Sequence, residues 1–193
     1  MTFIDRVLGG APRLGQVWLV AVDGPSGAGK STFAQALRGE FEARGAVTAV
    51  VGTDDFATWE NPVAWWPELV SKVLEPLAEG RPASYRGLDW STGTARPGEW
   101  FTIEPPDVLV LEGVSAGRAS LRPRLSGLCW LDGPGERARL ERAVARDGEA
   151  TRSHLERWQA FERGWFAADR TREYGHLCGL THGGQTGYFG NGE

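Results

Sequence analysis

The run Gly24-Pro-Ser-Gly-Ala-Gly-Lys30-Ser31 has the residue types and the spacing that bind phosphate. It matches G-x-x-x-x-G-K-[ST], in which glycines let backbone N–H groups turn inward around an anion. A lysine at this place reaches the β- and γ-phosphates of ATP, and the next hydroxyl is a ligand for Mg²⁺. We therefore expect Lys30 to act in catalysis and Ser31 to bind the metal. The residues expected to bind ATP are Gly24, Pro25, Ser26, Gly27, Ala28, Gly29, Lys30, Ser31 and Thr32.

Acidic residues follow two apolar runs and are placed to face this loop. Glu112 ends the run 108–111, the Walker B arrangement, so we expect it to hold Mg²⁺ through water, although a strand-end acid can also cap a loop. Asp54 and Asp55 follow the run 46–51 and should lie at the carboxyl edge of a parallel sheet. Asp54 is the candidate general base for a substrate hydroxyl. Either acid could instead belong to the Mg²⁺ shell or cap a helix.

Three arginines further along the chain could close over the phosphates. Arg139, Arg142 and Arg146 lie at i, i+3 and i+7, so one helix would present them as a single stripe. Forked guanidinium donors suit phosphate oxygens, and a mobile lid could bring them to the transferred group. The alternative is an exposed helix face whose arginines pair with Glu136 and Glu141. We favour the lid for Arg142 and Arg146 as catalytic residues and leave both roles open for Arg139.

The chain has 9 tryptophans, and five of them fall between Asp54 and Glu112. One interpretation of this concentration is an aromatic-walled site for a planar or apolar acceptor. The other interpretation is core packing. We favour packing for Trp65, Trp66 and Trp100 and the acceptor site for Trp59 and Trp90. The remaining four are expected in the core: Trp18, Trp130, Trp158 and Trp165.

Strand and helix signals alternate along the chain, which predicts an α/β fold. Short apolar runs between turn signals are typical of strands that are buried on both faces. We expect a three-layer P-loop NTPase fold with a mostly parallel five-stranded sheet and a small helical lid. The expected strands are 17–22, 46–51, 108–111, 128–131 and, more weakly, 176–180. The expected helices are 31–44, 67–78, 136–146 and 153–169.

Length and composition predict one globular domain. The chain has 193 residues, 41% of them apolar, which is enough for a sizeable core. We expect a single domain over 1–178, with the lid at about 137–153, and an irregular glycine-rich tail over 179–193. A net charge of -4 argues against a partner such as nucleic acid or an acidic membrane surface.

Two cysteines are too few for a disulfide framework, so Cys129 and Cys178 are expected as buried free thiols. The longest apolar run, 17–22, is too short for a bilayer, and residues 1–16 lack the apolar segment of a signal peptide. These features together predict a cytoplasmic protein, which could be a homo-oligomer.

The order and spacing of these motifs resemble the uridine kinase family, in the wider group with phosphoribulokinase and bacterial pantothenate kinase. The resemblance runs from about 17 to 169. Asp54-Asp55-Phe56 resembles the family's D-S-F-Y, whose Asp is the catalytic base, and Glu112-Gly113 resembles its magnesium-binding E-G strand. The segment 139–147 resembles the lid helix R-L-x-R-R-x-x-R-D.

The resemblance also implies residues that contact the acceptor. Trp59-Glu60-Asn61-Pro62 resembles F-D-H-P, a segment that lies at the nucleoside in the family. The segment 77–90 resembles G-x-x-x-x-x-P-x-Y-D-F, with extra residues after Tyr85. The acceptor-site residues expected from the motifs and the resemblance are Asp54, Phe56, Trp59, Glu60, Tyr85, Asp89 and Trp90.

This sequence departs from the family pattern at the acceptor. Ala57 replaces the Tyr of D-S-F-Y, Asn61 replaces the His of F-D-H-P, and no His follows Trp90 closely. No N-K-x-D guanine signature occurs, since Lys72 is the only lysine besides Lys30. We therefore expect an ATP-dependent kinase that phosphorylates a hydroxyl of a small molecule, a nucleoside or related metabolite. A sugar, vitamin precursor or specialised metabolite as acceptor, and a regulatory nucleotide-binding ATPase, stay open as alternatives.

Overall fold

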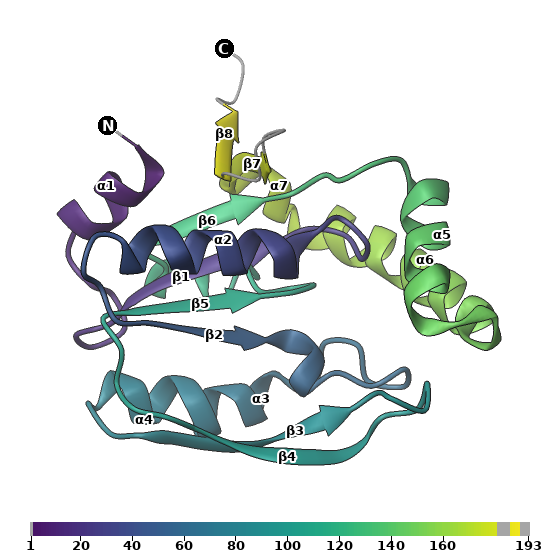
Figure 1. Cartoon of the computed structure of the whole chain (residues 1–193), viewed down its shortest axis with the longest axis horizontal. Helices are drawn as coiled ribbons and strands as arrows, with labels where there is room; N and C mark the ends of the chain where they lie inside the picture. The colour runs from purple at the N-terminus through teal and green to yellow at the C-terminus, as the bar shows by residue number, and fades with distance from the viewer. Residues whose placement is uncertain (1, 181–185, 190–193) are drawn as a thin grey trace.

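The computed structural model describes residues 2–180 and 186–189 of the chain. Its middle layer is a sheet with the strand order β2-β5-β1-β6-β7-β8, in which β8 runs antiparallel to β7 and all other neighbours are parallel (Figure 1). The prediction of a three-layer α/β fold around five parallel strands is confirmed. The strands are β1 (Trp18–Asp23), β2 (Thr48–Gly52), β5 (Val108–Glu112), β6 (Gly127–Trp130), β7 (His176–Leu180) and β8 (Thr186–Phe189).

The sixth strand lies in the glycine-rich segment that we expected to be irregular. That expectation is wrong for Thr186–Phe189, which pairs with β7 over four residue positions. Backbone N–H and C=O groups of an edge strand attract another strand whatever its side chains, so a segment with Gly187 can still form a ladder. The rest of the expected tail, 181–185 and 190–193, lies outside the described residues.

Two helices cover one face of the sheet, α1 (Phe3–Gly9) and α2 (Lys30–Glu42). Phe33, Leu37 and Phe41 of α2 are fully buried against alternate residues of β1 and β5. Their i, i+4, i+8 spacing predicted this helix correctly, because it puts all three on one side.

Another helix covers the other face and contains a π-helical turn. It comprises α3 (Trp66–Leu69), the π turn Val70–Leu74 and α4 (Glu75–Ala78), as the range 67–78 predicted. In the π turn the N–H of Glu75 donates to the carbonyl of Val70. Proline lacks an N–H and its ring clashes with the preceding turn, so the wider turn accommodates Pro76 without ending the helix.

A hairpin beside this helix was not predicted from the sequence. It comprises β3 (Ala83–Asp89) and β4 (Arg96–Ile103), paired antiparallel (Figure 1). Side chains alternate across a strand, and Trp100 falls on the outer face with 69% exposure, so its expected core position is wrong. Trp65 is buried as expected, and Trp66 packs against the core.

The remaining helical segments begin beyond the carboxyl ends of the parallel strands, at the right of Figure 1, and the last of them run back toward β7. This position puts them opposite the phosphate-binding sequence, where a lid would have to be. They are α5 (Glu136–Asp147), a 3₁₀ turn (Glu149–Thr151) and α6 (Arg152–Asp169), and α7 (Thr171–Tyr174) then leads back to β7.

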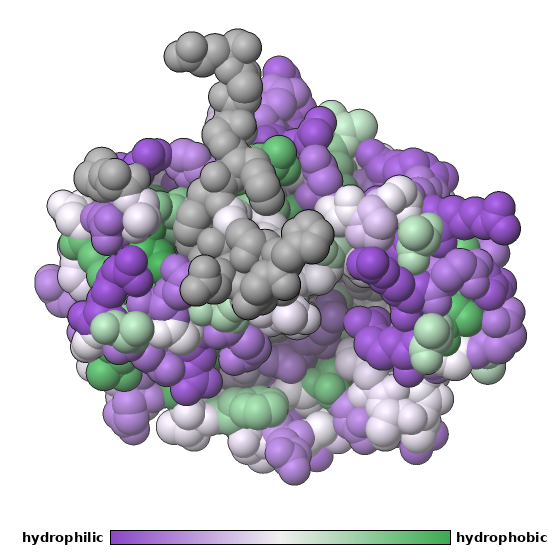
Figure 2. Space-filling view, turned by 45° about the horizontal axis from the view of Figure 1, so that its top comes forward, coloured by the Kyte–Doolittle hydropathy of each residue, from purple (hydrophilic) through white to green (hydrophobic). Residues whose placement is uncertain are grey.

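Both cysteines are buried and free, as predicted. Within residues 2–180 and 186–189, no helix combines the length and apolar character that a bilayer-spanning segment needs. The face in Figure 2 is mostly hydrophilic, with hydrophobic residues in small separate areas.

Candidate active site at the carboxyl edge of the sheet

The phosphate-binding sequence forms a tight turn between β1 and α2. Gly24 has φ +145° and a Cβ there would lie 2.2 Å from the carbonyl oxygen of Leu131, so this position requires glycine. Gly29 caps α2 with φ +94°, and Lys30 begins the helix. The Lys30 ammonium donates to the carbonyl of Pro25 at 3.0 Å. The loop therefore directs a helix N-terminus and a lysine toward the same space, as an anion site needs.

Asp23, the last residue of β1, stabilises this turn, and the sequence analysis did not predict a role for it. Its buried carboxylate accepts from the N–H of Gly24 at 2.7 Å, of Ser115 at 3.1 Å and of Gly117 at 2.8 Å. Burial raises the pKa of Asp23 to about 7, against the effect of these donors and of Lys30. Asp23 thus ties the phosphate loop to the loop after β5. An acid directly before the motif was the signal available in the sequence.

Glu112 lies beside the phosphate loop because the strand register puts it there. It pairs with Val22 of β1 and with Gly52 of β2, and the Ser31 hydroxyl donates to its carboxylate at 2.9 Å. Burial raises the pKa of Glu112, while the Lys30 charge opposes that shift. A hydroxyl and a carboxylate at the edge of a phosphate site are hard oxygen donors, which suit Mg²⁺. Ser31 and Glu112 therefore fit the expected metal role.

The two neighbouring acids after β2 face different surroundings. Both lie in a 3₁₀ turn, Thr53–Asp55. Asp54 is exposed and lines two cavities, and its backbone carbonyl accepts from the indole N–H of Trp90 at 3.1 Å. Asp55 points into the protein, where the Tyr85 hydroxyl donates to it at 2.9 Å. Burial raises the pKa of Asp55. Only Asp54 is thus open to a substrate hydroxyl.

A cavity of about 380 Å³ lies above the phosphate loop. Arg142 and Arg146 of α5 line it, together with Asp54 and Glu112. Arg139 lies apart from them, because its guanidinium donates to the carbonyl of Pro134 at 2.7 Å. We call residues 24–32 with Glu112 the phosphate edge. The phosphate-edge residues that line this cavity are Ser26, Gly27, Gly29, Lys30, Ser31, Thr32 and Glu112.

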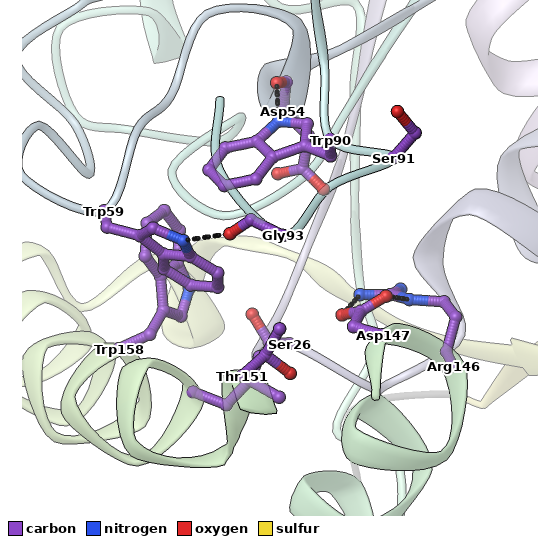
Figure 3. Close-up of a pocket in the computed structure, with 11 residues that line it drawn as sticks. Ser26, Asp54, Trp59, Trp90, Ser91, Gly93, Arg146, Asp147, Thr151 and Trp158 are labelled. Atoms are coloured by element: carbon purple, nitrogen blue, oxygen red, sulfur yellow. Dashed lines mark hydrogen bonds and ion pairs between the residues drawn. The ribbon is translucent and has the colours of Figure 1, made fainter. Parts of the chain in front are cut away.

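A second cavity of about 380 Å³ adjoins the first and has an aromatic side, the acceptor wall, formed by Trp59, Trp90 and Trp158 (Figure 3). The ring centroids of Trp59 and Trp90 lie 5.0 Å apart, and those of Trp59 and Trp158 lie 5.6 Å apart. The indole N–H of Trp59 donates to the Gly93 carbonyl at 3.0 Å, as that of Trp90 donates to Asp54. These two donors are used within the protein.

Arg146 and Asp147 lie across this cavity from Trp59, to the right in Figure 3. Arg146 donates twice to the Asp147 carboxylate, at 2.6 and 2.7 Å. These bonds raise the pKa of Arg146. The aromatic side thus faces a charged side, which suits a molecule with an apolar ring and a polar end.

Four expected acceptor residues do not line this cavity. Phe56 and Tyr85 stack on each other with centroids 5.0 Å apart, inside the core, because strand and turn direct them inward. Asp89 turns back to accept from the N–H and hydroxyl of Ser91, and Glu60 faces a separate surface hollow. Direct contact with the acceptor is therefore not supported for these four. Trp158 is buried in the core, as expected, but it also lines the cavity, which its helix spacing did not indicate.

The parallel sheet and the phosphate loop between β1 and α2 together define a P-loop fold of the α/β class. No protein-family model matches the chain, and no curated protein is significantly similar to it. Solved structures do match. A possible uridine kinase from Bacillus stearothermophilus matches with a TM-score of 0.62 and 18% identity, over 92% of this chain and 98% of that one.

A candidate fructose transport system kinase from Silicibacter sp. TM1040 matches with a TM-score of 0.63 and 20% identity, over 92% and 96% of the two chains. The YGR205w protein matches with a TM-score of 0.51 and 11% identity, over 96% and 92%. The chain thus has the fold of uridine kinase-like P-loop kinases over nearly its whole length.

Proposed function

We propose that the protein is an ATP-dependent kinase that transfers the γ-phosphate to a hydroxyl of a small molecule. One observation carries the proposal: the two cavities share Ser26, Asp54 and Arg146. A carboxylate and an arginine therefore lie where a bound acceptor would meet the γ-phosphate. The kinases of similar fold, described as acting on uridine or in fructose transport, support this class of reaction.

The transfer step follows from the positions of these residues. Asp54 accepts the proton of the acceptor hydroxyl as its oxygen attacks the γ-phosphorus. The bond from that phosphorus to the bridging oxygen then breaks, and ADP leaves with the bond electrons. Lys30, Arg142 and Arg146 offset the charge that spreads over the moving group. Ser31 and Glu112 would hold Mg²⁺, which supplies further charge neutralisation when bound.

The acceptor wall favours a molecule with a flat or apolar ring. The indole N–H groups of Trp59 and Trp90 are already used, so these residues present ring faces rather than hydrogen-bond donors. Ring faces bind other rings by stacking, without reading polar edges. A nucleoside base could stack there, but this wall does not supply the donors that would identify it.

The test is an acceptor panel with purified protein and MgATP. Pyrimidine nucleosides, ketohexoses and hydroxylated aromatic compounds would be compared by ADP release and by the mass of the product. We expect acceptor-dependent turnover. ADP release that no acceptor changes would contradict the proposal and favour the regulatory ATPase.

Variants then connect turnover to the site. We expect Lys30→Ala and Asp54→Asn to lower transfer at least about 100-fold, since both act on the reacting groups. Asp54→Asn should still bind MgADP. Lys72→Ala is the matched control, because Lys72 is exposed on the π turn and is the only other lysine. Full transfer by either site variant would overturn the proposed roles.

A further inference from the structure

An acidic residue of α6 reaches the phosphate loop from outside the recognised motifs. Glu162 is only 2% exposed. Its two carboxylate oxygens each lie 3.1 Å from the backbone N–H of Ser26, and the Ser26 hydroxyl donates to the same carboxylate. Ser26 is the second residue after Gly24, within the phosphate edge. α6 is thereby joined to the loop by charge-assisted hydrogen bonds, which are stronger than neutral ones.

Burying the Glu162 carboxylate costs free energy that an apolar residue at this position would not cost. A carboxylate that is taken out of water loses hydration, and burial accordingly raises the pKa of Glu162. The Lys30 charge and the Ser26 donors offset part of that loss. An apolar side chain of similar size would fill the same space without the loss. Packing alone therefore does not account for an acid at this position, and its hydrogen bonds to Ser26 indicate a different role.

The same face of α6 also borders the cavity that contains the acceptor wall. Leu155, Trp158 and Glu162 follow at i, i+3 and i+7, so they lie on one side of the helix. Leu155 and Trp158 line the cavity with the acceptor wall, and Ser26 lines both cavities. One rigid helix face thus contacts the acceptor side and, through Glu162, the phosphate loop at the point where the two cavities meet.

We propose that Glu162 is a positioning residue that holds Ser26, and with it the first half of the phosphate loop, in the shape that binds ATP. The inference rests on the proposed function for its effect on transfer, but not for its effect on nucleotide binding. A loop that is no longer held must be ordered when nucleotide binds, and this lowers affinity. It also lets the γ-phosphate deviate from the line of attack.

The experiment compares two substitutions of similar size. Glu162→Met fills the space without offering a hydrogen-bond acceptor to Ser26, whereas Glu162→Gln keeps a carbonyl oxygen that can accept from Ser26. We expect the Met variant to match or exceed the melting temperature of the wild type. We also expect its Kd for MgADP, followed by tryptophan fluorescence or calorimetry, to rise about tenfold. The Gln variant should stay within about threefold of the wild type. Glu156→Met, an exposed position on the same helix, is the control.

A second measurement asks whether Glu162 acts through Ser26. We expect Ser26→Ala to weaken MgADP binding by itself, and to add nothing when combined with Glu162→Met. In the transfer assay kcat should fall with the same pattern, while the KM of the acceptor changes little. A Met variant that binds MgADP like the wild type, or one that unfolds, would overturn the inference, as would full additivity. Failure of the proposed function gives a different result, a wild type that binds MgADP but transfers to no acceptor.

Discussion

The phosphate edge and the acceptor wall meet in one site but are built differently. The phosphate edge is almost entirely one stretch, 24–32, and the strand register places Glu112 beside it. The acceptor wall draws Trp59, Trp90 and Trp158 from a loop, a hairpin turn and a helix that are far apart in the sequence. Backbone geometry thus dictates the first, and side-chain packing dictates the second. Substitutions in the first should abolish chemistry, and those in the second should change which molecule is accepted.

The largest effect should come from the buried acid that holds the phosphate edge. The pKa of Asp23 is raised by burial to about 7 from 3.8, so between about pH 4 and 7 the folded protein keeps a proton that the unfolded chain releases. Stability from this group is therefore present below about pH 4 and is lost as the pH rises to about 7.

We expect the unfolding free energy of the wild type, relative to Asp23→Asn, to fall by on the order of 4 kcal/mol between pH 4 and 8. Denaturant unfolding of both proteins at several pH values measures it, and all other groups cancel in the difference. A difference that is constant with pH would show that the pKa of Asp23 in the folded protein is not raised.

A smaller but still large effect is expected at the metal position. Glu112→Gln removes a charge next to Ser31 while keeping the shape of the side chain, and we expect kcat to fall about 100-fold. The Mg²⁺ concentration for half-maximal rate should rise. Steady-state rates over a Mg²⁺ titration test this. Glu104→Gln, on the exposed segment after β4, is the control and should leave both values unchanged. An unchanged Mg²⁺ requirement in Glu112→Gln would remove Glu112 from the metal site.

The smallest effect is expected at the acceptor wall. It tests whether the acceptor wall and the phosphate edge act independently. Trp90→Ala should raise the KM of the acceptor about tenfold, because it removes one ring face from the cavity. The KM of ATP should stay within about twofold. Trp100→Ala is the matched control, since Trp100 lies on the same hairpin but is exposed. An equal rise in both KM values would mean that the wall and the phosphate edge do not act separately.

Much of the fold and of the phosphate edge could be predicted from the sequence, because their signals are local. Glycine spacing, the α2 periodicity and the apolar runs each depend on neighbours within a few residues. The β3–β4 hairpin was missed because its exposed strand, β4, has no buried alternation. Strand β8 was missed because backbone pairing at an edge needs no side-chain pattern.

The sequence by itself determined that this protein carries a phosphate loop with Lys30 and Ser31 on an α/β fold, since those features follow from short-range backbone geometry. Only the tertiary structure decided that Asp54 rather than Asp55 faces the cavities, because the Tyr85 hydroxyl draws Asp55 inward. It also decided that Phe56 packs in the core, and that Trp158 and Glu162 reach the site. These outcomes depend on contacts between segments tens of residues apart, which no local pattern encodes.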